Sequence, residues 1–318
     1  MSMRVLALLF VFVMVLTPQG PAVTPDQDAV IKVDVDLVNV LASVRGKNNA
    51  LIGNLEQKDF RIFEDGKEQQ IKYFTRETDL PLTIGLLVDV SGSMERLIDT
   101  ERRAADQFFT QVLGKKDLAF LISFGHEAEL LQDATNSTRL LREGLGQLRP
   151  NVPVGGVHPG PVPTSRATAG TILYDALFLA AEDRLKGEAG RKAMVVITDG
   201  VDTGSRKSRD QAIEAAHKAD ASIYSIYYAD PLMYGGGDDG VLKRMSGDTG
   251  GRVFYLDRRN SMEEAFRQIQ EEMRSQYAIS YSSTNTKRDG SFRKIEMRMA
   301  NKDHKVQTRR GYYAAEGN

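Results

Sequence analysis

The stretch Leu86-Leu87-Val88-Asp89-Val90-Ser91-Gly92-Ser93-Met94 decides the fold. It closes an almost unbroken apolar run that begins at Leu82, and such a run predicts a strand buried on both faces of a parallel sheet. We expect the strand to end at Asp89 and a helix to begin near Ser93. Ligands of open α/β sheets bind beyond the carboxyl ends of the strands. Asp89, Ser91 and Ser93 are therefore predicted to lie at a binding edge, where their hard oxygen atoms suit Mg²⁺ or Mn²⁺.

Strands and helices alternate from Leu82 to about Met273. Apolar residues at helical spacing follow the first strand, and the further apolar runs Leu118–Phe124, Ala193–Thr198 and Ser222–Tyr228 predict buried strands. Helical patterns separate these runs, as is typical of strand–helix–strand units. The alternation predicts a doubly wound, mostly parallel, Rossmann-like α/β sheet over residues 82–275.

The two flanks of this region have the alternating pattern of β-strands. Apolar and polar residues alternate from Ile31 to Leu37, and Asp65-Gly66 is a strong hairpin dipeptide. On the other flank, the run Val306 to Tyr312 predicts a last strand. Small β modules are only marginally stable alone. We therefore expect residues 28–78 and 276–314 to join in one small Ig-like β-sandwich, with the α/β domain inserted between them.

Two further segments carry oxygen-bearing side chains to the ends of predicted elements. The strand that ends at Thr198 leads into Asp199-Gly200, and Gly170-Thr171 stands at the start of another helix. Taken singly, Asp-x-Ser-x-Ser would serve equally well as a helix N-cap, and Asp199-Gly200 as a turn. The agreement of three distant segments with the strand pattern favours a single site.

The three segments together resemble the metal-ion-dependent adhesion site (MIDAS) of von Willebrand factor type A domains. Asp-Val-Ser-Gly-Ser, Gly-Thr before Tyr-Asp-Ala, and Ile-Thr-Asp-Gly match it in order and residue type, within a resemblance that spans residues 82–275. The resemblance implies that Ser91, Ser93 and Thr171 contact Mg²⁺ or Mn²⁺, with Ca²⁺ as an alternative. It implies that Asp89 and Asp199 neutralise the ion. An acidic residue of a protein partner would then complete the coordination shell.

The flanking segments are similar to those of bacterial secreted "VWFA-related" proteins. Residues Leu55 to Gly66 resemble the N-terminal module of that family, and Phe292 to Tyr313 resemble its tail. The family has no reaction assigned to it. The resemblance therefore implies a protein-binding module, for adhesion or as a scaffold, and not an enzyme.

The insertion Asn151–Ala169, rich in Pro and Gly, precedes Thr171. Many domains of the resembled family reach this threonine through a much shorter loop. Its place beside the predicted ion makes it a candidate partner-binding loop, with the contact residues Gly155, Gly156, His158 and Gly170. A surface excursion without a partner is the alternative, because long loops are either functional or unstructured.

The N-terminus has the pattern of an export signal. Arg4 precedes the apolar run Val5 to Leu16, which is too short to cross a bilayer comfortably and is typical of a signal-peptide core. Gly20 and Ala22 offer a cleavage site, so residues 1–22 are predicted to be a signal peptide. An uncleaved membrane anchor is the alternative. We expect the protein to work in the periplasm or outside the cell.

Composition limits the competing functions. A balance of 42 basic against 43 acidic residues gives no reason to expect nucleic acid as a partner, and the absence of Cys excludes disulfides and thiolate metal sites. No Walker A loop occurs, so no nucleotide is expected. An α/β-type hydrolase is the runner-up, although the chain lacks a Gly-x-Ser-x-Gly elbow and a histidine with an evident triad partner. A structural envelope protein with a vestigial site is the third alternative.

Overall fold

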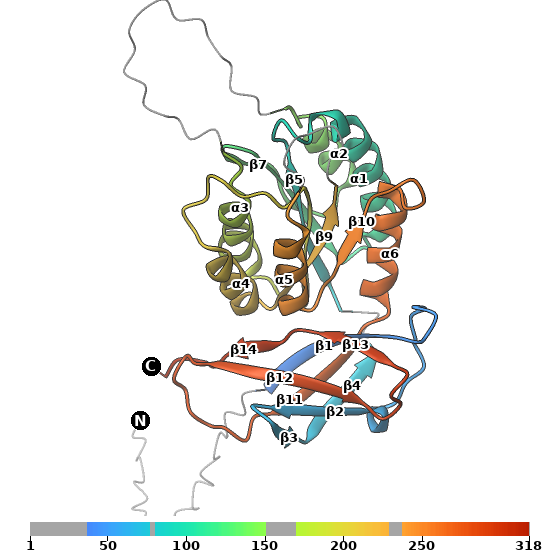
Figure 1. The fold of residues 1–318 in the computed structure, drawn as a ribbon, viewed down its shortest axis with the longest axis vertical. Helices are drawn as coiled ribbons and strands as arrows, with labels where there is room; N and C mark the ends of the chain where they lie inside the picture. Colours follow the sequence, from blue (N-terminus) through green and yellow to red (C-terminus); the bar gives the residue numbers. More distant parts are fainter. Residues whose placement is uncertain (1–36, 77–79, 151–169, 229–236, 318) are drawn as a thin grey trace, which may run out of the picture. The chain divides into compact units, whose positions relative to one another are not determined.

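The computed structural model describes residues 37–76, 80–150, 170–228 and 237–317 (Figure 1). Strands and helices from Leu37 onward belong to one compact unit, Asp36–Asn318. The predicted signal peptide, the strand pattern before Leu37 and the insertion 151–169 lie outside the described residues. Within the described residues, no helix is long and apolar enough to cross a membrane.

A six-stranded sheet forms the centre of the α/β domain, in the order β10-β9-β8-β5-β6-β7. All eight residues of its central strand β5 (Leu82–Asp89) are buried, as the apolar run predicted. Parallel pairing joins the strands from β10 to β6, and only β7 at the edge of this sheet is antiparallel. The other strands are β6 (Leu118–Phe124), β7 (Ala128–Thr135), β8 (Arg191–Thr198), β9 (Ala221–Tyr227) and β10 (Val253–Tyr255).

Helices cover both faces of this sheet (Figure 1). Leu86 and Val88 pack with α1, α2 and α6, whereas Leu87 packs with α3, α4 and α5 on the opposite face, because successive side chains of a strand alternate in direction. The helices are α1 (Ile98–Val112), α2 (Thr138–Leu145), α3 (Leu173–Leu179), α4 (Arg209–Lys218), α5 (Asp239–Thr249) and α6 (Met262–Arg274). Three short turns of other helix types are η1 (Gln57–Asp59), η2 (Glu95–Leu97) and η3 (Ala180–Leu185).

The order of the strands reverses at β5. The chain passes from β5 to β6 and β7 on one side, and then returns to place β8 on the other side of β5. In doubly wound sheets such a reversal opens a crevice at the carboxyl ends of the two strands, and ligands bind there. The expected doubly wound, mostly parallel fold is confirmed.

Strands from both ends of the sequence pair in two four-stranded antiparallel sheets, in the orders β13-β1-β11-β4 and β14-β12-β2-β3. Val40 of β1 lies opposite Ile279 of β11, and Ile62 of β2 lies opposite Met297 of β12. These four side chains are buried in one core, so the N- and C-terminal strands make the expected β-sandwich together. The strands are β1 (Leu37–Arg45), β2 (Phe60–Glu64), β3 (Lys67–Gln69), β4 (Ile71–Arg76), β11 (Tyr277–Ser282), β12 (Phe292–Met299), β13 (Lys305–Thr308) and β14 (Gly311–Tyr313).

One strand prediction is wrong, and two elements were not anticipated. The run Val306 to Tyr312 is not one strand but is divided between β13 and β14, which belong to different sheets. Between them, Arg309 and Arg310 form ion pairs with Asp220 and Asp248 of the α/β domain. The sequence pattern also missed β7, which has one buried residue, and α5, which contains two glycines.

A buried acid ties the end of α6 to the sandwich. Glu272 is 0 % exposed and accepts hydrogen bonds from Arg45 (2.6 Å) and Ser43 (3.2 Å) of β1 and from Arg252 (2.7 Å). The carboxylate therefore has donors from two parts of the fold. Arg191, at the start of β8, adds a bond to the carbonyl oxygen of Met273, 2.6 Å away.

Candidate metal site

Asp89 is the last residue of β5 and is 0 % exposed. Its Oδ1 accepts a hydrogen bond from the backbone N of Ser91 (2.9 Å), and its Oδ2 accepts one from Oγ1 of Thr198 (2.7 Å). Burial raises the pKa of Asp89 to about 6, and the nearby charge of Asp199 adds to the rise, whereas the bonds from Ser91 and Thr198 oppose it. The strand thus places a carboxylate in a poorly solvated position, with both oxygens oriented by neighbours.

Ser91 and Ser93 follow in the loop after β5, and both are half-buried. Their hydroxyl oxygens lie 3.1 Å apart. The N-cap of α1 is Leu97 and that of η2 is Met94, and neither makes a side-chain capping bond. The helix-cap alternative for Asp-x-Ser-x-Ser is therefore wrong, and the two hydroxyls converge for another reason.

Asp199 follows β8, the strand next to β5. Its Oδ1 accepts a hydrogen bond from the backbone N of Val201 (3.0 Å), and Gly200 adopts φ +81°, so the turn alternative describes its backbone correctly. The turn leaves Oδ2 of Asp199 without a hydrogen bond from any described residue. Because β5 and β8 are parallel neighbours, Asp89 and Asp199 lie at the same edge of the sheet.

Thr171 is held at this edge by bonds from both sides. Its carbonyl oxygen accepts from the backbone N of Thr203 and of Gly204, each 3.0 Å away, in the loop that follows Asp199. The next residue, Ile172, donates to the carbonyl oxygen of Gly125 (2.8 Å) just beyond β6. Thr171 therefore lies between the carboxyl ends of β6 and β8, which flank β5.

Gly170 and Gly204 allow these two loops to approach closely. A Cβ on Gly170 would lie 2.6 Å from Oγ1 of Thr203, and a Cβ on Gly204 would lie 2.7 Å from the carbonyl oxygen of Gly170. Either side chain would push the loops apart. Gly170 was expected as a partner contact, but it is buried and has this packing role, whereas Gly155, Gly156 and His158 lie outside the described residues.

Asp89 and Asp199 are not neutralised by basic side chains of the described residues. Among the described residues, no Lys or Arg forms an ion pair with Asp89 or Asp199. The two carboxylates repel each other enough to contribute to the raised pKa of Asp89. A bound cation would relieve that repulsion.

The donor set fits a hard divalent cation. Two carboxylates and three hydroxyls come from three segments, and they offer oxygen atoms only, which suits Mg²⁺ or Mn²⁺ and leaves room for a further ligand. In the described part of the chain, no group of three or more His, Asp or Glu side chains is arranged to hold a metal ion. The hydroxyls would therefore have to supply the remaining ligands.

Neighbouring residues support the edge without joining the donor set. Asp175 accepts hydrogen bonds from the backbone N of Arg206 and Lys207, and Asp202 accepts from Oγ of Ser205. These bonds give both acids a structural role in the loops around the site. Sequence reasoning missed Thr198, whose hydroxyl also accepts from the N of Gly200 (3.1 Å). Its place directly before Asp199, on a buried strand, was the available signal.

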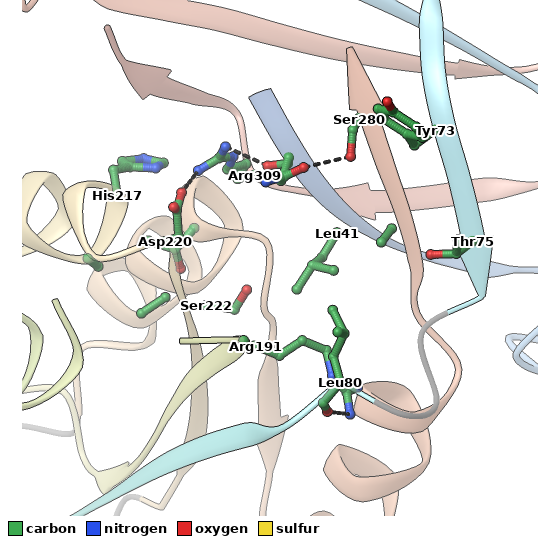
Figure 2. Close-up of a pocket in the computed structure, with 16 residues that line it drawn as sticks. Leu41, Tyr73, Thr75, Leu80, Arg191, His217, Asp220, Ser222, Ser280 and Arg309 are labelled. Carbon is green, nitrogen blue, oxygen red and sulfur yellow. Dashed lines mark hydrogen bonds and ion pairs between the residues drawn. The ribbon is translucent and has the colours of Figure 1, made fainter. Parts of the chain in front are cut away.

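A separate cavity of about 370 Å³ lies at the amino ends of the parallel strands, opposite the candidate metal site, among the residues drawn in Figure 2. Its walls include Leu41 and Ser280 of the sandwich and Arg191 and Ser222 at the starts of β8 and β9. Arg309 points to Asp220 there, and the two form an ion pair. Because β8 and β9 begin at this cavity and end at the other edge, the cavity is not part of the candidate metal site.

Comparison with known families gives one match within the α/β domain. The family model of the von Willebrand factor type A domain matches residues 84–201. All five candidate ligands, Asp89 to Asp199, fall within that range. No curated protein matches the chain.

Solved structures resemble the chain at low sequence identity. Proximal thread matrix protein 1 from the mussel byssus matches with a TM-score of 0.50 and 13 % identity, over 66 % of this chain and 51 % of that one. A second structure of that protein, described as having a zinc-occupied MIDAS motif, gives a TM-score of 0.49 and 13 % identity, over 67 % of this chain and 50 % of that one. BatB from Bacteroides thetaiotaomicron gives a TM-score of 0.46 and 17 % identity, over 60 % of this chain and 97 % of that one.

Proposed function

We propose that this chain, whose residues 84–201 match the von Willebrand factor type A domain, is an exported protein that binds a protein partner through a divalent cation. The cation is Mg²⁺ or Mn²⁺. Its ligands are the hydroxyls of Ser91, Ser93 and Thr171 and the carboxylates of Asp89 and Asp199. An acidic side chain of the partner fills the position that these residues leave open.

One observation carries this proposal. Asp89 and Asp199 end neighbouring parallel strands, repel each other and have no basic partner among the described residues. Two carboxylates in this arrangement favour a cation over an empty site. The neutral hydroxyls of Ser91 and Ser93 add donors without adding negative charge, which leaves the ion able to attract a partner's carboxylate.

The residues divide the work of the site. Asp89 is buried and held by Thr198, so it fixes the position of the cation. Asp199 and Thr171 belong to loops that are bonded to other strands, and they bring the remaining donors to the same edge. We propose binding and no catalysis, because every donor is accounted for by the ion and its acidic partner.

Metal binding is tested by calorimetry on the purified protein. We expect Mn²⁺ and Mg²⁺ to bind the wild type and not to bind Asp89→Ala. Asp99→Ala, which removes an exposed acid from the first turn of α1, is the matched control and should bind like the wild type. Circular dichroism checks that each variant is folded. If the wild type takes up neither ion even with acetate present, the proposal is wrong.

The partner is tested by affinity capture from envelope extract, with and without EDTA. A partner that uses the cation should be retained by the wild type and lost both in EDTA and with Asp89→Ala. A protein retained under all three conditions binds elsewhere on the molecule. If Asp89→Ala, without EDTA, retains a partner that EDTA removes from the wild type, the role given to the ion at this site is contradicted.

A further inference from the structure

Glu101 is a buried carboxyl group that has no role in the ligand set above. It lies in the first turn of α1 and is 0 % exposed. Neither of its oxygen atoms has a hydrogen-bond partner among the residues that the structure describes. The adjacent Arg102 donates instead to Asp99 and to the carbonyl oxygen of Leu148. Burying an unpaired carboxyl group is unfavourable, so an interaction beyond the described side chains is needed to explain it.

Glu101 lies within electrostatic reach of the candidate metal site. Only Met94 and the short turn η2 separate the Asp89–Ser93 segment from α1. Burial, and next the negative charge of Asp89, raise the pKa of Glu101 well above its usual range. The carboxyl groups of Asp89 and Glu101 are therefore electrostatically coupled.

The surroundings strengthen that coupling. Val88 and Val90, on either side of Asp89 in sequence, belong to the same buried apolar cluster as Ile98 and Ala105, which lie one turn from Glu101 on α1. Charges interact more strongly in such an interior than in water. A cation held by Asp89 would therefore act on Glu101 as well.

We infer that Glu101 is a positioning residue of the metal site, which strengthens cation binding through its charge without contacting the ion and destabilises the fold while the site is empty. The inference rests on the proposed function. It explains why an acid occupies a position where an apolar residue would pack. Outer groups of this kind commonly change metal affinity by about tenfold or more.

The test uses two variants of Glu101 and one control. Glu101→Gln removes the charge and keeps the shape, and Glu101→Met removes all polarity at similar length. Glu95→Gln removes an exposed acid from the same segment. We expect calorimetry to show Mn²⁺ binding that is about tenfold weaker in both Glu101 variants and changed by about twofold or less in the control. In EDTA, Glu101→Met should melt at a higher temperature than the wild type.

The outcomes separate this inference from the proposed function. If the wild type binds Mn²⁺ and the Glu101 variants bind it equally well, only the inference is wrong. A lower melting temperature of Glu101→Met in EDTA would make Glu101 a structural residue and would also overturn it. If the wild type binds no Mn²⁺, the proposed function and the inference fail together.

Discussion

Thr198 donates a hydrogen bond from Oγ1 to Oδ2 of Asp89, 2.7 Å away, and thereby links the ends of β8 and β5. Oγ1 of Thr198 also accepts a hydrogen bond from the backbone N of Gly200, 3.1 Å away. Thr198 is 0 % exposed, so water does not compete for either bond. One hydroxyl therefore orients the buried carboxylate and the turn that carries Asp199.

Thr198→Val keeps the shape of the side chain and removes this hydroxyl. We expect the free energy of unfolding to fall by about 1–3 kcal/mol, because Gly200 N and Asp89 Oδ2 each lose a buried partner. Mn²⁺ affinity should fall by about tenfold, as for other groups that orient metal ligands. Urea denaturation and calorimetry measure the two effects. Thr198→Ser, which keeps the hydroxyl, is the control; equal losses in both variants would point to packing instead.

The pKa of Asp89 predicts how stability in EDTA depends on pH. It is raised from 3.8 to about 6, chiefly by burial, so between these values the folded protein binds more protons than the unfolded chain. Protonation of Asp89 therefore contributes about 3 kcal/mol to the free energy of unfolding. This contribution is present below about pH 4 and is lost as the pH rises through 6. Asp89→Asn should remove it. Urea denaturation of both proteins in EDTA at about pH 4.5 and pH 7 measures the change, and parallel pH profiles would contradict this account.

Much of the fold was predictable because its central strands have continuous apolar runs. β5 and β8 are buried along nearly their whole length, so their apolar residues follow one another without alternation and predict burial on both faces. β7 lies at the sheet edge with Leu131 as its one buried residue, and an edge strand needs no apolar run. The division at Arg309 and Arg310 depends on Asp220, in the turn between α4 and β9, and on Asp248 of α5, and both lie far away in sequence. Local pattern contains no signal for such distant pairs.

The candidate ligands were predictable because each stands at the end of a recognisable element. Asp89 ends one apolar strand and Asp199 directly follows the neighbouring one, and topology alone then places them at one edge. Thr198 and Glu101 were missed for a different reason. A threonine in a β-strand is ordinary, and an acid in the first turn of a helix is favoured by the helix dipole, so neither residue type is unusual where it stands. Only their burial and their neighbours distinguish them.

His217 predicts a loss of stability in acid that does not involve the metal site. It is 5 % exposed, and its ring packs in T-shaped arrangements with the rings of Phe292 and Tyr313, with centroids 5.6 and 6.3 Å away. Burial, and next the charge of Arg309, lower the pKa of His217 from 6.5 to about 4, although Asp220 opposes them. The unfolded chain therefore binds the proton first, and stability present above pH 6.5 is lost as the pH falls through 4.

His217→Phe should remove this sensitivity, because the ring remains and the titrating group does not. The wild type should lose about 3 kcal/mol more than the variant between pH 7 and pH 4. Chemical denaturation at the two pH values gives the comparison. His304→Phe, at a less buried histidine, is the control and should follow the wild type. If the difference in free energy of unfolding between the wild type and His217→Phe is the same at pH 7 and at pH 4, the histidine does not titrate as described.

Glu272 provides the sharpest test of how the sandwich and the α/β domain stabilise each other. It is 0 % exposed and accepts bonds from Arg45 of β1 and from Arg252, at 2.6 and 2.7 Å. Removing one member of a buried ion cluster leaves the other charges unpaired, so Glu272→Gln should lower the free energy of unfolding by about 3–5 kcal/mol. Glu143→Gln breaks the exposed pair with Arg139 and should cost less than about 1 kcal/mol. Urea denaturation followed by circular dichroism measures both, and similar costs for the two variants would mean that Arg45 and Arg252 find other partners or water once the carboxylate is gone.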